Sequence, residues 1–416
     1  MSITRIATAR VRLLLGSLLG VVVAAILAGS PALGASAREA AAVSGFDPYS
    51  ASFVSSSTGW VLGSAPCASG GRCAALLETT DGGRHWSARA LPAALAAAAD
   101  RRVGGVPAEL VEAPGAGLNV RFANTSDGWI YGGLGSAASG ATVKPVLWST
   151  HDRGLTWRQD PVRGLGRQDT IFDLEASAGT AYLLESTTAY GTLAVKSSPV
   201  SMDSWHPSSA PPLGGPAGGG EQAGALVLAG SSGWLVEGND RGTTGSARLE
   251  HGRWVAWRPP CAAVGHSFSI PVASTPNNLV ASCVMGGFAY SLSKAAPRGA
   301  KLGSTWLYLS HDGGKTFTAG PELPAHIDGF AVLASTSPHS VLASSSTASG
   351  HEQVLASFDG GLHWSAVYTD AQPNRTIDLA FPSPTRGVAV LRPYQGATST
   401  MIMSFDGGHH WAPVSF

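Results

Sequence analysis

The sequence predicts an all-β repeat protein, and two observations support this fold class. One octapeptide pattern, Ser/Thr-x-Asp-x-Gly-x-x-Trp/Phe, occurs five times in the chain. Each copy follows a short apolar run, such as Ala74 to Leu77, which is typical of a buried strand. The five copies begin at Thr79, Thr150, Ser310, Ser357 and Ser404. A unit that recurs at intervals of roughly fifty residues indicates a repeat architecture.

The octapeptide has the composition of a tight turn between two strands. A Ser or Thr hydroxyl and an Asp carboxylate accept hydrogen bonds from nearby backbone N–H groups. The glycine two residues after the aspartate can adopt a positive φ angle, and the aromatic residue then opens the next strand. We expect structural roles for the aspartate and aromatic positions, which are Asp81 and Trp86, Asp152 and Trp157, Asp312 and Phe317, Asp359 and Trp364, and Asp406 and Trp411. The same expectation holds for the histidines of these turns, His85, His363, His409 and His410.

A second repeated segment marks the strand starts. Gly59-Trp60, Gly128-Trp129 and Gly233-Trp234 each lead into an apolar strand, and four weaker versions bring the number of starts to seven. Two segments are eroded octapeptides, 201–205 and 249–254. Five intact and two eroded turns therefore match seven strand starts, which predicts seven repeated units.

The octapeptide resembles the Asp box, also called the BNR repeat, of sialidase-like β-propellers, where it joins the third and fourth strands of a blade at the outer rim. Its combination with the Gly-Trp starts is similar to the photosystem II stability/assembly factor type, over about residues 46–416. The resemblance implies a single seven-bladed β-propeller of four-stranded antiparallel blades with Asp-box turns. It also implies a chaperone-like binding role, although the arginine-rich face of that group is not apparent here.

The N-terminus has the composition of a targeting segment. Arg5, Arg10 and Arg12 precede an apolar run, 13–28, that is short for a membrane span, and Ala35-Ser36-Ala37 is a plausible cleavage site. We expect a secreted or extracytoplasmic protein, with membrane attachment only if the segment is not cleaved. The predicted organisation is a signal peptide at 1–37, a leader at 38–45 and the propeller at 46–416.

Composition narrows the class of partner. Removal of residues 1–37 leaves 24 Lys and Arg against 27 Asp and Glu, a formal charge of −3, which argues against a general nucleic-acid binder. We expect a monomer without a cofactor or metal.

The four cysteines favour disulfides in an oxidising compartment, because Cys67 and Cys73 lack the paired histidine of a zinc site. Cys261 and Cys283, placed in the last strand of blade 4 and in blade 5, would join neighbouring blades.

Two segments depart from the repeat. An insertion at 91–117 contains an alanine-rich stretch, 93–99, that could form a helical turn or two, and 211–220 has the composition of a flexible connector. The chain ends five residues after Trp411, so ring closure is expected to rest on packing of blade 7 against blade 1, unless the leader adds a strand.

Four charged residues are candidates for ligand binding at the mouth of the central channel: Arg121, Asp173, Asp328 and Asp378. All four occur in predicted inner strands, which line the channel of a propeller. The carboxylates either accept hydrogen bonds at strand ends or form a polar or cation-binding pocket.

The sequence favours a binding function over catalysis. Sialidase chemistry needs an arginine cluster and a tyrosine nucleophile. The Phe-Arg-Ile-Pro motif of that family is absent: the nearest candidate is Arg121, and its local sequence, Val120-Arg121-Phe122, does not match the motif. We therefore expect a secreted, non-catalytic propeller that binds or scaffolds a protein or a cell-surface glycan. The alternative is a glycoside hydrolase, sialidase-like or xyloglucanase-like, that uses carboxylates at the channel mouth.

Overall fold

The computed structural model describes residues 43–67, 70–97, 102–103, 106–107, 117–134, 144–160, 170–186, 193–209, 223–239, 242–264, 271–285, 295–325, 327, 332–372, 374–393 and 398–416. Contacts divide the chain into two units, Met1–Glu39 and Ala40–Phe416. All described residues belong to the second unit. Among them, no helix has the length and apolar character needed to cross a membrane.

Seven four-stranded antiparallel sheets follow one another along the second unit, as the sequence predicts. We call each sheet a blade. Blade 1 contains β1 (Asp47–Phe53), β2 (Gly59–Pro66), β3 (Arg72–Thr79) and β4 (Ser87–Arg89). Blade 2 contains β7 (Leu118–Phe122), β8 (Gly128–Leu134), β9 (Lys144–Thr150) and β10 (Arg158–Gln159). Blade 3 contains β11 (Thr170–Ser177), β12 (Thr180–Ser186), β13 (Leu193–Pro199) and β14 (His206–Pro207).

The remaining blades repeat this order. Blade 4 contains β15 (Ala223–Ala229), β16 (Ser232–Asn239), β17 (Gly242–Glu250) and β18 (Arg253–Ala256). Blade 5 contains β19 (Val272–Ala273), β20 (Leu279–Val284), β21 (Thr305–Ser310) and β22 (Thr318–Glu322). Blade 6 contains β23 (Leu333–Ser337), β24 (Ser340–Ser346), β25 (Glu352–Ser357) and β26 (Ser365–Thr369). Blade 7 contains β27 (Asn374–Ala380), β28 (Gly387–Pro393), β29 (Thr400–Ser404) and β30 (Ala412–Pro413).

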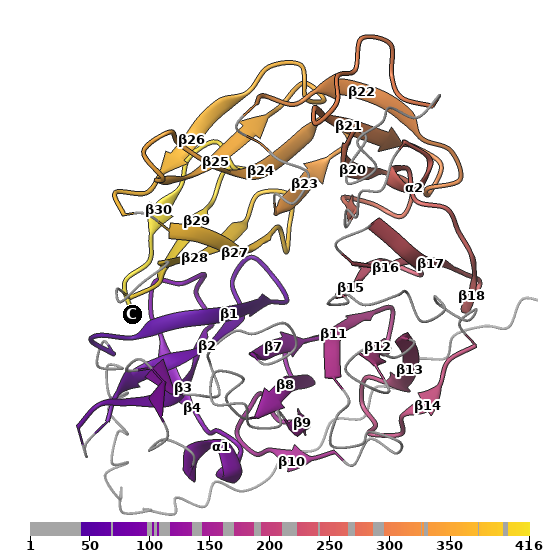
Figure 1. Cartoon of the computed structure of the whole chain (residues 1–416). Helices are drawn as coiled ribbons and strands as arrows, with labels where there is room; N and C mark the ends of the chain where they lie inside the picture. Colours follow the sequence, from indigo (N-terminus) through magenta and orange to yellow (C-terminus); the bar gives the residue numbers. More distant parts are fainter. Residues whose placement is uncertain are drawn as a thin grey trace, which may run out of the picture. The chain divides into compact units, whose positions relative to one another are not determined.

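Apolar clusters fill the contact surfaces between neighbouring blades. Leu62 of blade 1 and Ile130 of blade 2 are fully buried in one cluster, and Leu184 of blade 3 shares another with Leu235 of blade 4. Blade 7 packs against blade 1 in the same way, so the last strands lie beside the first ones (Figure 1). The ring therefore closes by packing between two complete four-stranded sheets, without an exchanged strand in the described residues.

Each intact octapeptide joins the third and fourth strands of its blade. In the first, Thr79 Oγ1 donates to Asp81 Oδ1 over 2.9 Å, and Gly83 N donates to Thr79 Oγ1 over 2.8 Å. Gly83 has a φ angle of 87°, and a Cβ built there would lie 2.9 Å from the sulfur of Met403 in blade 7. The glycine is thus required both by the turn and by close packing against the preceding blade.

The Gly-Trp strand starts also connect blades. Trp60 in β2 is fully buried, and its Nε1 donates to the carbonyl of Arg153 in the turn of blade 2 over 3.3 Å. Trp234 in β16 donates in the same way to Gly313 in the turn of blade 5 over 3.1 Å. The equivalent Trp129 contacts Trp205 in the eroded turn of blade 3, and its buried Nε1 has no acceptor among the residues that the structure describes.

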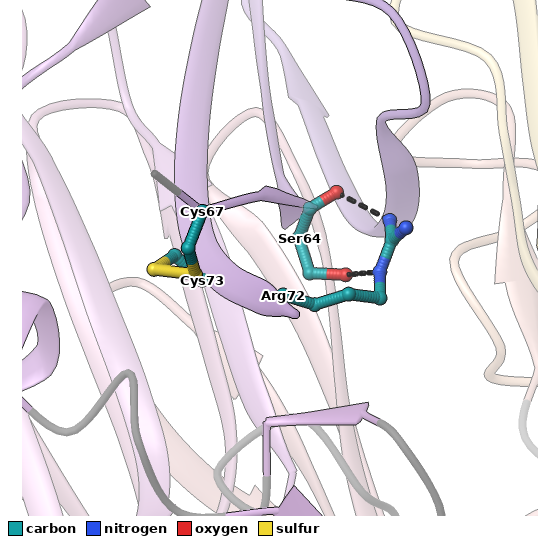
Figure 2. The surroundings of a disulfide bond; sticks show 4 residues. All are labelled: Ser64, Cys67, Arg72 and Cys73. Atoms are coloured by element: carbon teal, nitrogen blue, oxygen red, sulfur yellow. Dashed lines mark hydrogen bonds between the residues drawn. A yellow bond between two sulfur atoms is a disulfide. The ribbon is translucent and has the colours of Figure 1, made fainter. Parts of the chain in front are cut away.

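Both predicted disulfides form. Cys67 and Cys73 close a hairpin between β2 and β3, next to Arg72, which donates from Nε to Ser64 Oγ and from Nη2 to Ser64 O, each over 2.8 Å (Figure 2). Cys261 pairs with Cys283 of β20. The placement of Cys261 in the last strand of blade 4 was wrong: β18 ends at Ala256, and Cys261 opens the short helix α2 (Cys261–Val264) that follows it.

The insertion after blade 1 contains the short helix α1 (Ala93–Ala97) and a hairpin of β5 (Arg102–Val103) and β6 (Val106–Pro107). The alanine-rich stretch therefore forms one helical turn in the described residues. The proposed connector at 211–220 lies outside the described residues.

Candidate functional site

Charged and polar side chains from three inner strands come together at the centre of the ring. Arg121 lies on β7, Asp173 and Glu175 on β11, and Asp378 on β27. Asp173 and Glu175 are two residues apart in one strand, so both side chains leave the same face of it. Arg121 is within electrostatic range of all three carboxyl groups. We call these four residues the central cluster.

An ion pair between neighbouring blades is a partly accessible feature of the central cluster. Arg121 Nη2 lies 2.5 Å from Glu175 Oε1, and Arg121 Nε donates to the carbonyl of Leu174 over 3.3 Å. The two charged side chains keep 31% and 21% of their surface exposed. They are therefore deep among protein atoms and yet reached by solvent.

Asp173 accepts hydrogen bonds from backbone N–H groups of two blades. Its Oδ1 accepts from the N–H of Leu174 over 2.8 Å and from the hydroxyl of Tyr131 over 3.3 Å. Its Oδ2 accepts from the N–H of Leu226 in β15 over 2.9 Å. Asp173 thus connects the inner strand of blade 3 to that of blade 4.

The same connection recurs at equivalent positions around the ring. Asp378 in β27 accepts from the N–H of Ala51 in β1, and Ser50 in β1 accepts from the N–H of Val120 in β7 over 3.1 Å. In β1, β11 and β27 a bulge directly precedes this position. Because a bulge redirects the following side chain, it aims the acceptor at the next blade. The carboxylates of Asp173 and Asp378 therefore accept hydrogen bonds from the inner strand of the next blade.

The charges of the central cluster are unbalanced, with three carboxyl groups facing one guanidinium. Burial raises the pKa of Glu175 to about 8, although Arg121 acts in the opposite direction. Burial also raises the pKa values of Asp173 and Asp378 above their usual range. For Arg121, burial opposes the charged form, but Glu175, the first of its charged neighbours, raises its pKa. The cluster therefore carries uncompensated negative charge when its carboxyl groups ionise.

Sequence reasoning found part of this site. Arg121, Asp173 and Asp378 come together, whereas Asp328 lies outside the described residues. Glu175 was missed, although its spacing from Asp173 places it on the same face of one strand. Arg375 was also missed: it is on the inner strand β27, exposed and opposite Arg392 in the register.

The turn aspartates lie apart from this site and are engaged locally. His85, His363 and His410 each place Nδ1 between 2.5 and 2.6 Å from the aspartate of their own turn. In the other two turns a threonine hydroxyl occupies this position, 2.6 Å from the aspartate. His409 instead stacks on Phe358 of the preceding blade, with ring centroids 3.7 Å apart.

The eroded turn of blade 3 keeps its aspartate in a different role. Asp203 Oδ2 accepts from Ser149 Oγ over 2.9 Å and pairs with Arg158, both in blade 2. It also lies 3.3 Å from Nε2 of His151, whose Nδ1 is 2.7 Å from Asp127. Burial opposes protonation of His151, but its hydrogen bonds to the two aspartates raise its pKa. Asp203 thus connects blades 2 and 3 at the rim.

No family model and no curated protein matches this sequence. Solved structures do match it. YCF48 bound to D1 peptide has a TM-score of 0.51 at 19% identity, over 88% of this chain and 95% of that chain. YCF48 from Cyanidioschyzon merolae has a TM-score of 0.47 at 13% identity, over 87% and 96% of the two chains. A polysaccharide lyase, ulvan lyase bound to its saccharide, has a TM-score of 0.47 at 10% identity, over 89% and 95%. At these identities the likeness concerns the fold.

The class defined by the fold is the seven-bladed β-propeller, and the solved neighbours include both binding proteins and enzymes. Among the residues that the structure describes, no group of three or more His, Cys, Asp or Glu side chains is arranged to hold a metal ion.

Proposed function

We propose that this propeller is a secreted binding protein whose central cluster receives a basic group of a protein ligand. The observation that carries the proposal is the Arg121–Glu175 pair, which is solvent-accessible in a cluster where three carboxyl groups face one guanidinium. A ligand ammonium or guanidinium would supply the missing positive charge. Because the proposal rests on charge, it favours a protein segment with an accessible basic residue over an acidic glycan.

The hydrogen bonds that the other two carboxylates of the central cluster accept support a binding role. Asp173 and Asp378 accept backbone hydrogen bonds between blades, so their oxygens are occupied before any ligand arrives. A catalytic carboxylate pair needs one group free to donate a proton and another free to attack or activate water. The peptide bound to YCF48 supports the compatibility of this fold with a peptide ligand.

Glycoside hydrolysis is the second candidate, and one observation favours it. The pKa of Glu175 is raised to about 8, so this side chain is largely protonated at neutral pH and could act as a general acid. It would need a carboxylate partner, for which Asp328 is the remaining sequence candidate.

The remaining sequence expectations are part of the proposal. The octapeptides would be Asp boxes, and residues 1–37 would be a signal peptide that directs the chain to an oxidising compartment. The disulfides Cys67–Cys73 and Cys261–Cys283 support that localisation. The protein is expected to act as a monomer.

The test combines peptide-array and glycan-array binding with a glycosidase screen. We expect basic peptides as ligands, with affinity lost when the basic residue of the peptide is acetylated or replaced by glutamine. At pH 9, where Glu175 is mostly ionised, Glu175→Gln should weaken binding at least tenfold. Glu322→Gln, at an exposed position on β22, is the matched control and should bind as the unmodified chain does. Glycan hits with turnover that Glu175→Gln abolishes would replace the binding proposal with hydrolysis.

A further inference from the structure

Blade 4 contains a buried carboxyl group that has no partner among the described residues. Glu237 on β16 is 0% exposed, and neither of its carboxyl oxygens has a hydrogen-bond partner in that part of the chain. Burial alone raises its pKa, to about 7. Because an unpaired buried carboxylate is strongly unfavourable, such a side chain is normally found only as the neutral acid or for a functional reason.

The register shows which surface Glu237 faces. It pairs with Gly224 of β15 and Gly245 of β17, so the side-chain positions of these three residues are on one face of the sheet. A Cβ built on Gly224 would lie 2.5 Å from Leu193 and 2.9 Å from Leu184, both in blade 3. Glu237 therefore points into the apolar surface between blades 3 and 4.

Other charged side chains on the strands around Glu237 are directed away from it or form ion pairs with each other. On blade 3, Lys196 of β13 pairs with Glu185 of β12 at 2.5 Å, on the face directed at blade 2. On β17, Arg248 pairs with Glu250 and donates to a carbonyl of blade 5. β15 has no charged residue.

Two titratable side chains of blade 3 face this surface in the described residues, Asp173 of β11 and Tyr182 of β12. Asp173 accepts from the N–H of Leu226 in β15. Burial raises the pKa of Tyr182, and the ring of Tyr182 contacts Trp254 edge-on, with centroids 5.6 Å apart. In the described part of these strands, no cation compensates Glu237. Arg241 follows Glu237 closely in sequence and lies outside the described residues.

This contact surface also lacks the indole hydrogen bond that joins other blades. Tyr182 stands where blades 1, 2 and 4 have tryptophan, and the turn of blade 4 at 249–254 is one of the two eroded copies. By contrast, Trp60 and Trp234 donate to intact turns in the following blades. The surface between blades 3 and 4 therefore combines a missing rim connection with a titratable group in its apolar layer.

We propose that the contact between blades 3 and 4 is a pH-responsive element of the ring, closed when Glu237 is a neutral acid and loosened when Glu237 ionises. The effect reaches the central cluster, because the hydrogen bond from Leu226 to Asp173 crosses the same surface two residues from Gly224 along β15. Alkaline pH would thus weaken the hydrogen bond that Asp173 accepts from the N–H of Leu226.

Amide hydrogen exchange on the full chain tests this inference. With an ordinary pKa of 4.5 in the open state and about 7 in the closed state, linkage predicts that local opening of β15 and β16 increases about tenfold from pH 6 to pH 8, after correction for intrinsic exchange. Peptides from β21 and β22 of blade 5 are the internal reference and should show no such increase. Glu237→Gln, and Glu237→Leu as a second neutral variant, should remove the pH dependence.

Two controls separate this mechanism from others. Glu322→Gln should retain the tenfold change, and Arg241→Gln should leave exchange in β15 and β16 unaltered. The proposal is overturned if both neutral Glu237 variants keep the pH dependence, or if all blades of the unmodified chain open equally between pH 6 and pH 8. It is also overturned if Arg241→Gln increases exchange in β15 and β16, because Glu237 would then be paired. Ligand binding is not part of these readouts, so the outcome is independent of the proposed function.

Discussion

Replacement of Asp173 by alanine tests the inter-blade role of the inner-strand carboxylates. The substitution removes the acceptor of two buried N–H groups, those of Leu174 and Leu226, which are 0% and 3% exposed. An orphaned buried donor costs about 1–3 kcal/mol. Relief from burying the carboxyl group offsets part of this loss, so we expect Asp173→Ala to lower the free energy of unfolding by about 2–4 kcal/mol.

Serine at this position provides an internal check. Ser50 occupies the equivalent place in β1 and accepts the N–H of Val120 through its hydroxyl. Asp173→Ser should therefore recover about half of the loss, because a hydroxyl can replace one of the two acceptors. Asn119 holds the same register position in β7, and Asn119→Ala is a matched control expected to cost less than about 1 kcal/mol.

Urea unfolding followed by tryptophan fluorescence measures these differences, provided that the dependence on denaturant is the same for all variants. Exchange of the Leu226 amide should increase in Asp173→Ala and less in Asp173→Ser. The reasoning is refuted if Asp173→Ala is within 0.5 kcal/mol of the unmodified chain, a margin of about the size of ordinary surface substitutions. It is also refuted if serine is no better than alanine.

Three further predictions concern the turns and rim. Trp60→Phe should cost about 1 kcal/mol more than Trp129→Phe in urea unfolding, because only the first indole has an acceptor in the next turn; equal losses would contradict the indole connection. Gly361→Ala should destabilise by at least about 2 kcal/mol more than Gly360→Ala, since both have positive φ angles but only at Gly361 does a new Cβ meet a neighbour, at 2.5 Å; similar thermal unfolding midpoints would disprove this. Hydrogen bonds within the turns outweigh burial and lower the pKa of three aspartates to about 2, so their stabilisation is complete above pH 4 and is lost as the pH falls through 2. Thermal unfolding from pH 5 to pH 1.5 should show a loss that begins below pH 4, and a loss already complete at pH 4 would contradict it. The three residues are Asp81, Asp312 and Asp406.

The repeat made the architecture predictable. Intact turns fix strand ends locally, through contacts within eight residues. The five intact and two eroded copies, matched to seven strand starts, therefore gave seven blades. The disulfides were predictable for a similar reason, since Cys67 and Cys73 flank a short hairpin. Cys261 was misplaced because the last strand of blade 4 ends earlier than its apolar pattern suggests.

The central cluster was only partly predictable, because its geometry depends on pairs far apart in sequence. Asp173 was identified as a channel residue, but the N–H that it accepts belongs to a strand of another blade. Asp203 was unpredictable for the same reason. Its eroded turn keeps the aspartate, but the side chain pairs with Arg158 of the neighbouring blade, which the sequence alone does not show. Glu237 could not be singled out from the sequence, because its isolation depends on which charged groups of the described residues face it in the packed ring.

The most direct test of the proposed central binding site is the dissociation constant of the selected basic peptide, measured for the unmodified chain and for Glu175→Gln between pH 6 and pH 9. If the peptide's basic group binds the ionised carboxylate, affinity rises with pH until the pKa of about 8 is passed. Glu175→Gln then binds at least about tenfold more weakly at pH 9 and without that pH dependence. Equal affinity of the two chains at every pH would contradict the assignment of the central cluster as the binding site.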